Sequence, residues 1–120
     1  MAFNDMEMVI MEMNRIKYLI KQKRIIIKGH IKEKIEKQHL VDIDVVKSNL
    51  EKPKNLIGVE EQVARYKHDK TYKLCFKLSG RKKLIVIITY KKLKNRIYVV
   101  TAFITKKKMD RLIKLPKVKR

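Results

Sequence analysis

The chain has 120 residues, of which 45% are hydrophobic, and its 32 lysines and arginines against 12 acidic residues give a formal net charge of +20 at pH 7. This length is typical of one domain with its own core. The apolar content excludes a disordered basic tail, because such a tail cannot bury enough apolar surface to offset the entropy of ordering. The surplus positive charge predicts a polyanionic partner, with nucleic acid as the first candidate and an anionic membrane surface as the second.

Cysteine usage and the first residues indicate where the protein works. Cys75 is the only cysteine, so neither a disulfide within the chain nor a cysteine-cluster metal site is possible, and packing inside a strand is its expected role. The N-terminus lacks the pattern of a secretory signal, and no apolar run approaches the roughly 20 residues that span a bilayer. We therefore expect a soluble, cytoplasmic protein without a metal or small-molecule cofactor.

Helical spacing dominates the first part of the chain. Apolar residues recur there at steps of three and four, which predicts one stripe of a helix within residues 1–23. The stripe consists of Phe3, Met6, Val9, Ile10, Met13, Ile16, Leu19 and Ile20. Asn4 and Glu7 fit a capping box at the start of this helix. Core packing is the expected use of the methionines, with partner binding as the alternative.

Shorter elements follow this helix. Residues 24–28 predict a brief strand or extended link, which Gly29 ends. The amphipathic pattern of residues 30–38 predicts a second helix. A third helix is expected to start at Asp42 as its N-cap and to stop before Pro53.

The period then changes to that of strands. Residues 62–68 and 72–78 alternate between the two sides of a strand. Residues 84–90 are apolar on both sides and predict a central strand, joined through a turn near Asn95 to a strand at 97–105. The order of elements predicts an α+β domain, with N-terminal helices packed on one face of an antiparallel sheet of about four strands. The other face is expected to stay open.

Three segments are expected along the chain. An N-terminal amphipathic helix occupies residues 1–23, an α+β domain residues 24–108, and a basic C-terminal tail residues 109–120. Lys106 and Lys107 begin the basic stretch that leads into the tail, and both are expected to contact nucleic acid.

Familiar patterns of ATP hydrolysis and metal chemistry are missing from the sequence. Asp42 and Asp44 are better explained as a helix start than as a magnesium pair, which disfavours a metal-dependent nuclease. What remains suits metal-free cleavage of RNA, in which the ribose 2′-hydroxyl attacks its own phosphate. Histidine supplies the proton transfers of such a reaction, and lysine and arginine stabilise the charge that builds on the phosphate.

Three histidines are candidates for proton transfer. His30 follows Gly29 at a helix start, where free backbone N–H groups favour a phosphate, and an ordinary surface position weighs equally. His39 ends its helix, where a cationic ring complements the helix dipole. His68 either touches phosphate or marks a turn.

A basic and aromatic cluster lies near the middle of the chain. Arg65 and Lys67 share one face of their predicted strand, and Tyr66 and His68 share the other. On an open sheet, cations can bind the backbone of single-stranded nucleic acid while neighbouring aromatic rings stack on its bases. A β-strand face that is only solvated is nevertheless the commoner arrangement. Thr101 interrupts a later apolar strand. It either presents its hydroxyl to a phosphate or is a polar residue accommodated at the edge of the sheet.

Several short segments occur in the order found in a known group of domains. They are Lys28-Gly29-His30, residues 41–46 and 50–53, Arg65-Tyr66-Lys67, the strands 72–78, 84–90 and 97–105, and Val100-Thr101-Ala102-Phe103. Over residues 24–108 this order resembles small toxin-like ribonuclease domains of the barnase, EndoU, colicin and RelE group, in their RelE-like or BrnT-like form.

The resemblance implies a RelE-like α+β sheet and metal-independent cleavage of RNA, with an acidic antitoxin-like protein as a partner. It carries four residues over to catalytic positions. His30 matches the helix-start histidine, Arg65 and Lys67 match phosphate-facing cations, and Thr101 matches a hydroxyl of the terminal strand.

One departure from the group concerns the arginine that often follows the histidine, which is lysine here, at Lys34 or Lys37. These two lysines are expected to bind nucleic acid, as are Tyr66 and His68, but lysine lacks the bidentate fork of arginine. Two function classes therefore stay open, a metal-independent endoribonuclease of toxin type and a nucleic-acid-binding protein without chemistry. A third function class is attachment of the first helix to a membrane surface, but the acidic residues in the first half of that helix oppose it.

Overall fold

The computed structural model describes residues 5–108, apart from the side chains of four residues near the start of the first helix. The described chain contains three α-helices, two short 3-10 helices and five strands. They are α1 (Asp5–Gln22), β1 (Arg24–Ile26), α2 (Gly29–Lys37), α3 (Ile43–Glu51), η1 (Pro53–Asn55), β2 (Leu56–Gln62), β3 (Asp69–Ser79), β4 (Lys82–Lys91), η2 (Lys92–Lys94) and β5 (Arg96–Thr105). The α+β class with N-terminal helices is confirmed.

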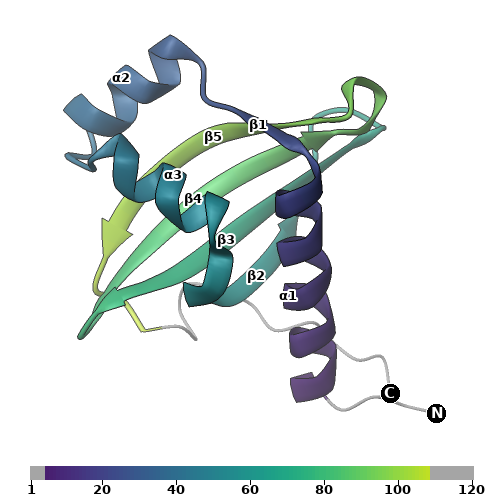
Figure 1. Ribbon diagram of the computed structural model, residues 1–120, viewed down its shortest axis with the longest axis horizontal. Helices are drawn as coiled ribbons and strands as arrows, with labels where there is room; N and C mark the ends of the chain where they lie inside the picture. The colour runs from purple at the N-terminus through teal and green to yellow at the C-terminus, as the bar shows by residue number, and fades with distance from the viewer. Residues whose placement is uncertain (1–4, 109–120) are drawn as a thin grey trace.

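The strands form one mixed sheet in the order β1-β5-β4-β3-β2 (Figure 1). Neighbouring strands are antiparallel except β1, which runs parallel to β5 and pairs Arg24 with Arg96 and Ile26 with Tyr98. The predicted antiparallel arrangement holds for β2 to β5, but the sheet has a fifth strand, β1, whose parallel pairing makes the sheet mixed. The sequence did not indicate the β1–β5 pair, because pairing between segments far apart in the chain leaves no trace in local periodicity.

The second strand of the sheet lies earlier in the chain than the alternation predicts. β2 ends at Gln62, which pairs with Thr71, and residues 63–68 form a loop and turn instead of the predicted strand. A bulge between Leu56 and Gly58 breaks the alternation of β2 and hides it from a search for period two. Residues 63–68 pair with no neighbouring strand, so the alternation of their side chains does not correspond to a β-strand.

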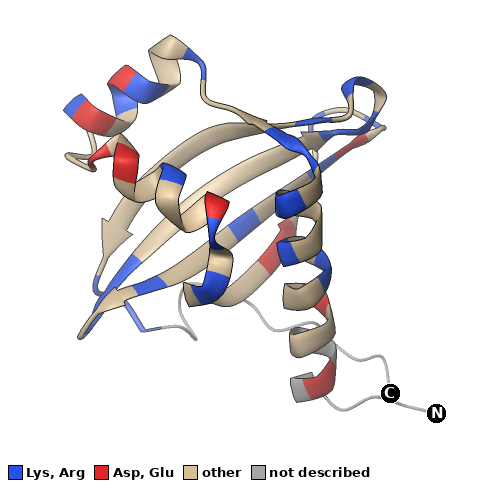
Figure 2. Cartoon of the chain, viewed as in Figure 1, with Lys and Arg blue, Asp and Glu red and all other residues tan. Residues whose placement is uncertain are grey.

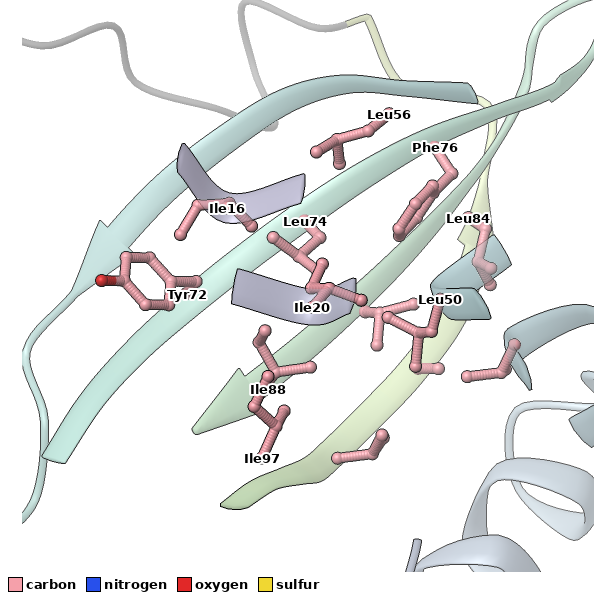
Figure 3. Packing of buried hydrophobic residues seen from close by; sticks show 14 of the residues in the cluster. Ile16, Ile20, Leu50, Leu56, Tyr72, Leu74, Phe76, Leu84, Ile88 and Ile97 are labelled. Carbon is pink, nitrogen blue, oxygen red and sulfur yellow. The ribbon is translucent and has the colours of Figure 1, made fainter. Parts of the chain in front are cut away.

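The helix-covered face of the sheet carries the core. Figure 3 shows Ile16 and Ile20 of α1 and Leu50 of α3 above buried side chains of the strands. The strand residues in this cluster are Leu56 and Val59 of β2, Tyr72, Leu74 and Phe76 of β3, Leu84, Val86 and Ile88 of β4, and Ile97, Val99 and Ala102 of β5. α1 and α3 lie across this face (Figure 1), and α2 contacts β5.

The predicted stripe of the first helix is buried in its second half. Ile16 and Ile20 are buried, and Met13 and Leu19 pack against the core, whereas Ile10 is 46% exposed. The remaining stripe side chains, and Asn4 of the predicted capping box, lie outside the described part of the structure. Because α1 shares the core of the sheet, residues 1–23 do not have a separate core in the part described.

Two local predictions are confirmed. The Asp42 side chain caps α3 by accepting a hydrogen bond of 2.9 Å from the backbone N–H of Asp44. Asn95 adopts a left-handed conformation with φ of 53° between β4 and β5, as expected of a turn residue. The predicted tail at 109–120 lies outside the described residues. Of the helices within residues 5–108, none is long and apolar enough to cross a membrane.

Candidate nucleic-acid interface

The sheet face opposite α1 and α3 is named here the open face. It is formed by the alternate side chains of the three long strands that do not enter the main core. They are Asp69, Thr71, Lys73, Cys75 and Lys77 of β3, Lys83, Ile85, Ile87, Thr89 and Lys91 of β4, and Arg96, Tyr98, Thr101, Phe103 and Thr105 of β5. Near its centre a small second cluster buries Cys75 and Ile85 against Ile57, Ile87 and Phe103.

Charge is segregated between the two parts of the molecule. Figure 2 shows that acidic residues gather on the helices and on β2. Residues 70–108, which form most of β3 and all of β4 and β5, contain lysines and arginines throughout and no aspartate or glutamate. These strands are therefore the part of the described chain where positive charge is least neutralised by its own sequence, and on the open face Glu60 opposite Lys73 and Asp69 opposite Lys91 are the acidic neighbours of the lysines.

A pocket of about 510 Å³ lies where one end of the open face meets the start of α2 and the β2–β3 loop. We name it the tyrosine pocket. Its lining residues are Lys28, His30, Ile31, Gln62, Val63, Arg65, Tyr66, Asp69, Thr71, Ile87, Thr89, Lys91, Tyr98, Val99 and Val100. Asp69 is the one acidic residue among them.

Two tyrosine rings and three cations dominate the tyrosine pocket. The ammonium groups of Lys28 and Lys91 lie 5.4 Å and 5.3 Å from the ring centre of Tyr98. The ring of Tyr66 lies 5.7 Å from the Arg65 guanidinium and 6.0 Å from the Lys91 ammonium. Cations at these distances are attracted to the ring faces, so each ring is held beside a phosphate-binding group.

Neutral polar groups complete the pocket. The hydroxyls of Thr71 and Thr89 lie 3.0 Å apart across β3 and β4 and form a hydrogen bond. Gln62 stands opposite Thr71, so its amide adds both a donor and an acceptor at the same level of the sheet. Such groups recognise the polar edge of a base or a ribose hydroxyl, which an array of lysines alone does not.

The start of α2 brings backbone donors to the same place. Lys28 occupies the N-cap position, without a side-chain cap, and His30 lies in the first turn. The first N–H groups of a helix have no partner inside the helix and favour an anion. His30 is exposed and lines the tyrosine pocket, so its imidazole lies beside a site with three cations.

The structure brings together three of the residues that the sequence predicts for the site. His30, Arg65 and Tyr66 line the tyrosine pocket. Lys67 and His68 do not line it, because residues 63–68 form a loop in which the strand-like sharing of faces is lost. The expected pairing of Arg65 with Lys67 on one strand face is therefore wrong.

The other predicted residues lie away from the pocket. Thr101 belongs to the open face, where its Oγ1 is buried and makes no hydrogen bond within residues 5–108. Lys34 and Lys37 are exposed on α2, and Lys37 pairs with Glu33 at 2.7 Å.

Near the far end of the open face, Lys106 and Lys107 are exposed, and the Lys107 carbonyl accepts a hydrogen bond of 3.1 Å from Lys83 Nζ. These two lysines therefore lie beside the lysine-bearing end of β4, although they do not line the tyrosine pocket.

Sequence reasoning missed Lys28, Lys91 and Tyr98 as site residues. Tyr98 and Lys91 come from the two strands of the β4–β5 hairpin, and Lys28 follows β1, which pairs with β5. Their meeting depends on the parallel β1–β5 pair, which no local pattern predicted. The alternation of β5 alone offered a usable signal, because it places Tyr98 on the face opposite Ile97 and Val99.

Cys75 is buried on the open face, as the sequence predicts. Burial raises the pKa of its thiol to about 11, although the nearby ammonium groups of Lys83 and Lys73 act in the opposite direction. A buried, protonated thiol is inert as a nucleophile. Within residues 5–108, no three histidine, cysteine, aspartate or glutamate side chains are grouped so that they could hold a metal ion.

Comparison with known proteins finds no relative of this chain. The sequence matches no protein-family model, and neither the curated proteins nor the solved structures contain a match. The resemblance to toxin-like ribonucleases therefore stays a prediction.

Proposed function

We propose that this protein binds RNA, and that the tyrosine pocket is the centre of the binding site. The observation that carries the proposal is the Tyr98 ring with the ammonium groups of Lys28 and Lys91 at 5.4 Å and 5.3 Å. An aromatic surface for a base beside cations for the flanking phosphates is the combination by which proteins hold unpaired nucleotides.

The surroundings of Tyr98 support this assignment. Tyr66 offers a second ring that is 59% exposed, and Arg65 adds a guanidinium suited to a phosphate. The hydroxyl pair of Thr71 and Thr89 gives hydrogen-bonding groups at the same depth. A purely electrostatic surface would need none of these neutral groups.

The proposal is tested by fluorescence anisotropy with a labelled unpaired RNA of ten nucleotides. Tyr98→Ala should weaken binding roughly tenfold, since stacking of one base contributes about 1–3 kcal/mol. Tyr18→Ala is the matched control, because Tyr18 is 67% exposed on α1, outside the open face and the pocket. Equal affinities of the two variants would contradict the role of the pocket.

A second candidate function is metal-independent endoribonuclease activity of the RelE-like toxin type. It is favoured by one observation, the presence of His30 beside Arg65 in the lining of the pocket. In this reaction His30 would accept the proton of the 2′-hydroxyl as the 2′-oxygen bonds to phosphorus, and Arg65 and Lys28 would stabilise the charge on the phosphate. The P–O5′ bond would break, and the departing 5′-oxygen would take a proton from solvent. An acidic antitoxin-like protein would bind over the same cations.

The two candidates are separated by incubating RNA with the protein in excess EDTA. A nuclease of this type cleaves under these conditions, and His30→Ala abolishes cleavage while RNA affinity is retained. A binding protein without chemistry leaves the RNA intact in every case. Cleavage that EDTA removes, or that His30→Ala leaves unchanged, would rule out the proposed mechanism.

A further inference from the structure

We infer that the RNA bound in the tyrosine pocket is an extended single strand, whose phosphates continue along the open face over β3 and β4 to Lys77 and Lys83. This inference rests on the proposed function and adds the class of RNA and the length of chain that is recognised. It follows from the register of the strands, which places the groups of the open face in successive rows.

The rows run from the tyrosine pocket to the opposite end of the sheet. At the edge of the pocket, Lys73 lies in a row with Ile87, which lines the pocket, and with Thr101. The last row is formed by Lys77, Lys83 and Thr105. Cations therefore occur at the pocket, in the middle and at the far end of one continuous surface.

The far row contains an arrangement that an anion would stabilise. Lys77 and Lys83 are direct neighbours across β3 and β4, so two positive charges stand opposite each other. Like charges in this position repel. The Lys83 ammonium donates hydrogen bonds to the carbonyls of Arg81 and Lys107, at 3.3 Å and 3.1 Å, and Lys77 is exposed. A phosphate between the two lysines would remove the repulsion.

Acidic residues limit the path to the middle of the sheet. Glu60 stands opposite Lys73 on the β2 side, and Asp69 stands opposite Lys91 at the end of β3. A polyanion is therefore repelled from the β2 edge and from the start of β3, and favoured over β4 and the later part of β3, since residues 70–108 contain no aspartate or glutamate. On β5, Phe103 is half-buried, with the His39 ring 6.1 Å away, and offers a second aromatic surface for a base.

The dimensions of the face fix the length of RNA. Lys91 and Lys83 are eight residues apart on β4, which corresponds to roughly 27 Å at about 3.4 Å per residue. A stacked strand advances about 3.4 Å per nucleotide and would need about eight nucleotides to cover this path. The extended strand inferred here advances further per nucleotide and needs fewer, about four to six. That length is at the lower end of the range for single-strand-binding grooves. A duplex cannot insert a paired base into the pocket.

The inference is tested with labelled oligoadenylates of two to ten nucleotides at about 50 mM salt. Affinity should rise steeply up to about six nucleotides and only slightly beyond that length. Lys77→Gln should weaken binding of the octamer roughly five- to tenfold, which is the counterion contribution of one phosphate contact. The affinity for the dinucleotide should stay unchanged. Lys47→Gln is the matched control, because it removes the same charge from an exposed position on α3.

The outcomes separate this inference from the proposed function. If the octamer and the dinucleotide bind equally, or if Lys77→Gln and Lys47→Gln behave alike, the path along the open face is wrong while the pocket stands. A ten-base-pair duplex that binds as tightly as the single strand overturns the choice of single-stranded RNA. If no RNA binds the folded protein, the inference and the proposed function fail together.

Discussion

Replacing Lys77 by glutamine should make the free protein more stable, even though we expect it to bind RNA less well. The reason is the position of Lys77 directly opposite Lys83 on neighbouring strands. Lys77 is the residue to change because it is exposed, whereas the Lys83 ammonium makes hydrogen bonds to two backbone carbonyls that a substitution would leave without their donor.

The size of the effect follows from the geometry. A cross-strand pair contributes about 0.2–1 kcal/mol, and for an exposed pair of like charges we take ~0.5 kcal/mol as the repulsion removed. The unfolding entropy of a chain of 120 residues is roughly 0.25 kcal/mol/K at about 2.1 cal/mol/K per residue. The melting temperature should therefore rise by about 2 °C at low salt. The gain should disappear near 1 M salt, where the Debye length is only about 3 Å.

Thermal unfolding followed by circular dichroism at about 10 mM and 1 M salt measures this shift. Lys37→Gln is the control, because it lowers the net charge by the same amount but removes an ion pair of 2.7 Å with Glu33. That variant should lose about 0.2–0.5 kcal/mol of stability. If both substitutions raise the melting temperature equally, the effect comes from total charge and the argument from the facing lysines is refuted.

Three further predictions concern the fold and its single thiol. Leu40→Gly should stabilise the protein by about 1 kcal/mol in urea unfolding, because Leu40 has φ of 54° and is 83% exposed, so glycine relieves strain without loss of packing. Asp42→Ala should cost about 1 kcal/mol by the same assay, since the cap of α3 is lost, and Asp42→Asn should restore most of it. The pKa of Cys75 rises from 9.0 to about 11 on burial, so its protonated form contributes stability that is fully present below pH 9 and is lost as pH rises through 11. The stability difference between the wild type and Cys75→Ala should therefore shrink between pH 9 and 11, and a constant difference would exclude this linkage.

Most of the helices and strands could be predicted because their signals are local. Asp42 caps a helix whose buried residues recur at helical spacing. The strand around residues 84–90 is apolar on both sides because Leu84, Val86 and Ile88 enter the main core, while Ile85 and Ile87 pack in the small second cluster on the opposite face. Two features were missed or misplaced. Residues 24–28 were expected to form a brief strand or link, but the pairing of β1 with the distant β5 was not predicted, and β2 was misplaced because a bulge disrupts its alternation.

The candidate site was harder to predict than the fold for the same reason. Residue type alone indicated His30, Arg65 and Tyr66, and all three line the tyrosine pocket. Lys91 gave no signal, and the alternation of β5 placed Tyr98 opposite Ile97 and Val99 without distinguishing a site residue from a structural one. They became candidates only when the sheet placed them beside residues from the start of α2 and the β2–β3 loop.

The distribution of charge argues that the open face has a role beyond solubility. A soluble surface is served best by interspersed charges of both signs, and α1, α2 and α3 have this mixture. Residues 70–108 do not, and two of their lysines face each other at a cost in stability. Because the main core occupies the opposite face of the sheet and the second cluster on the open face is apolar, folding does not require this arrangement of lysines. An anion that follows the rows of the open face would account for both the segregation of charge and the facing lysines.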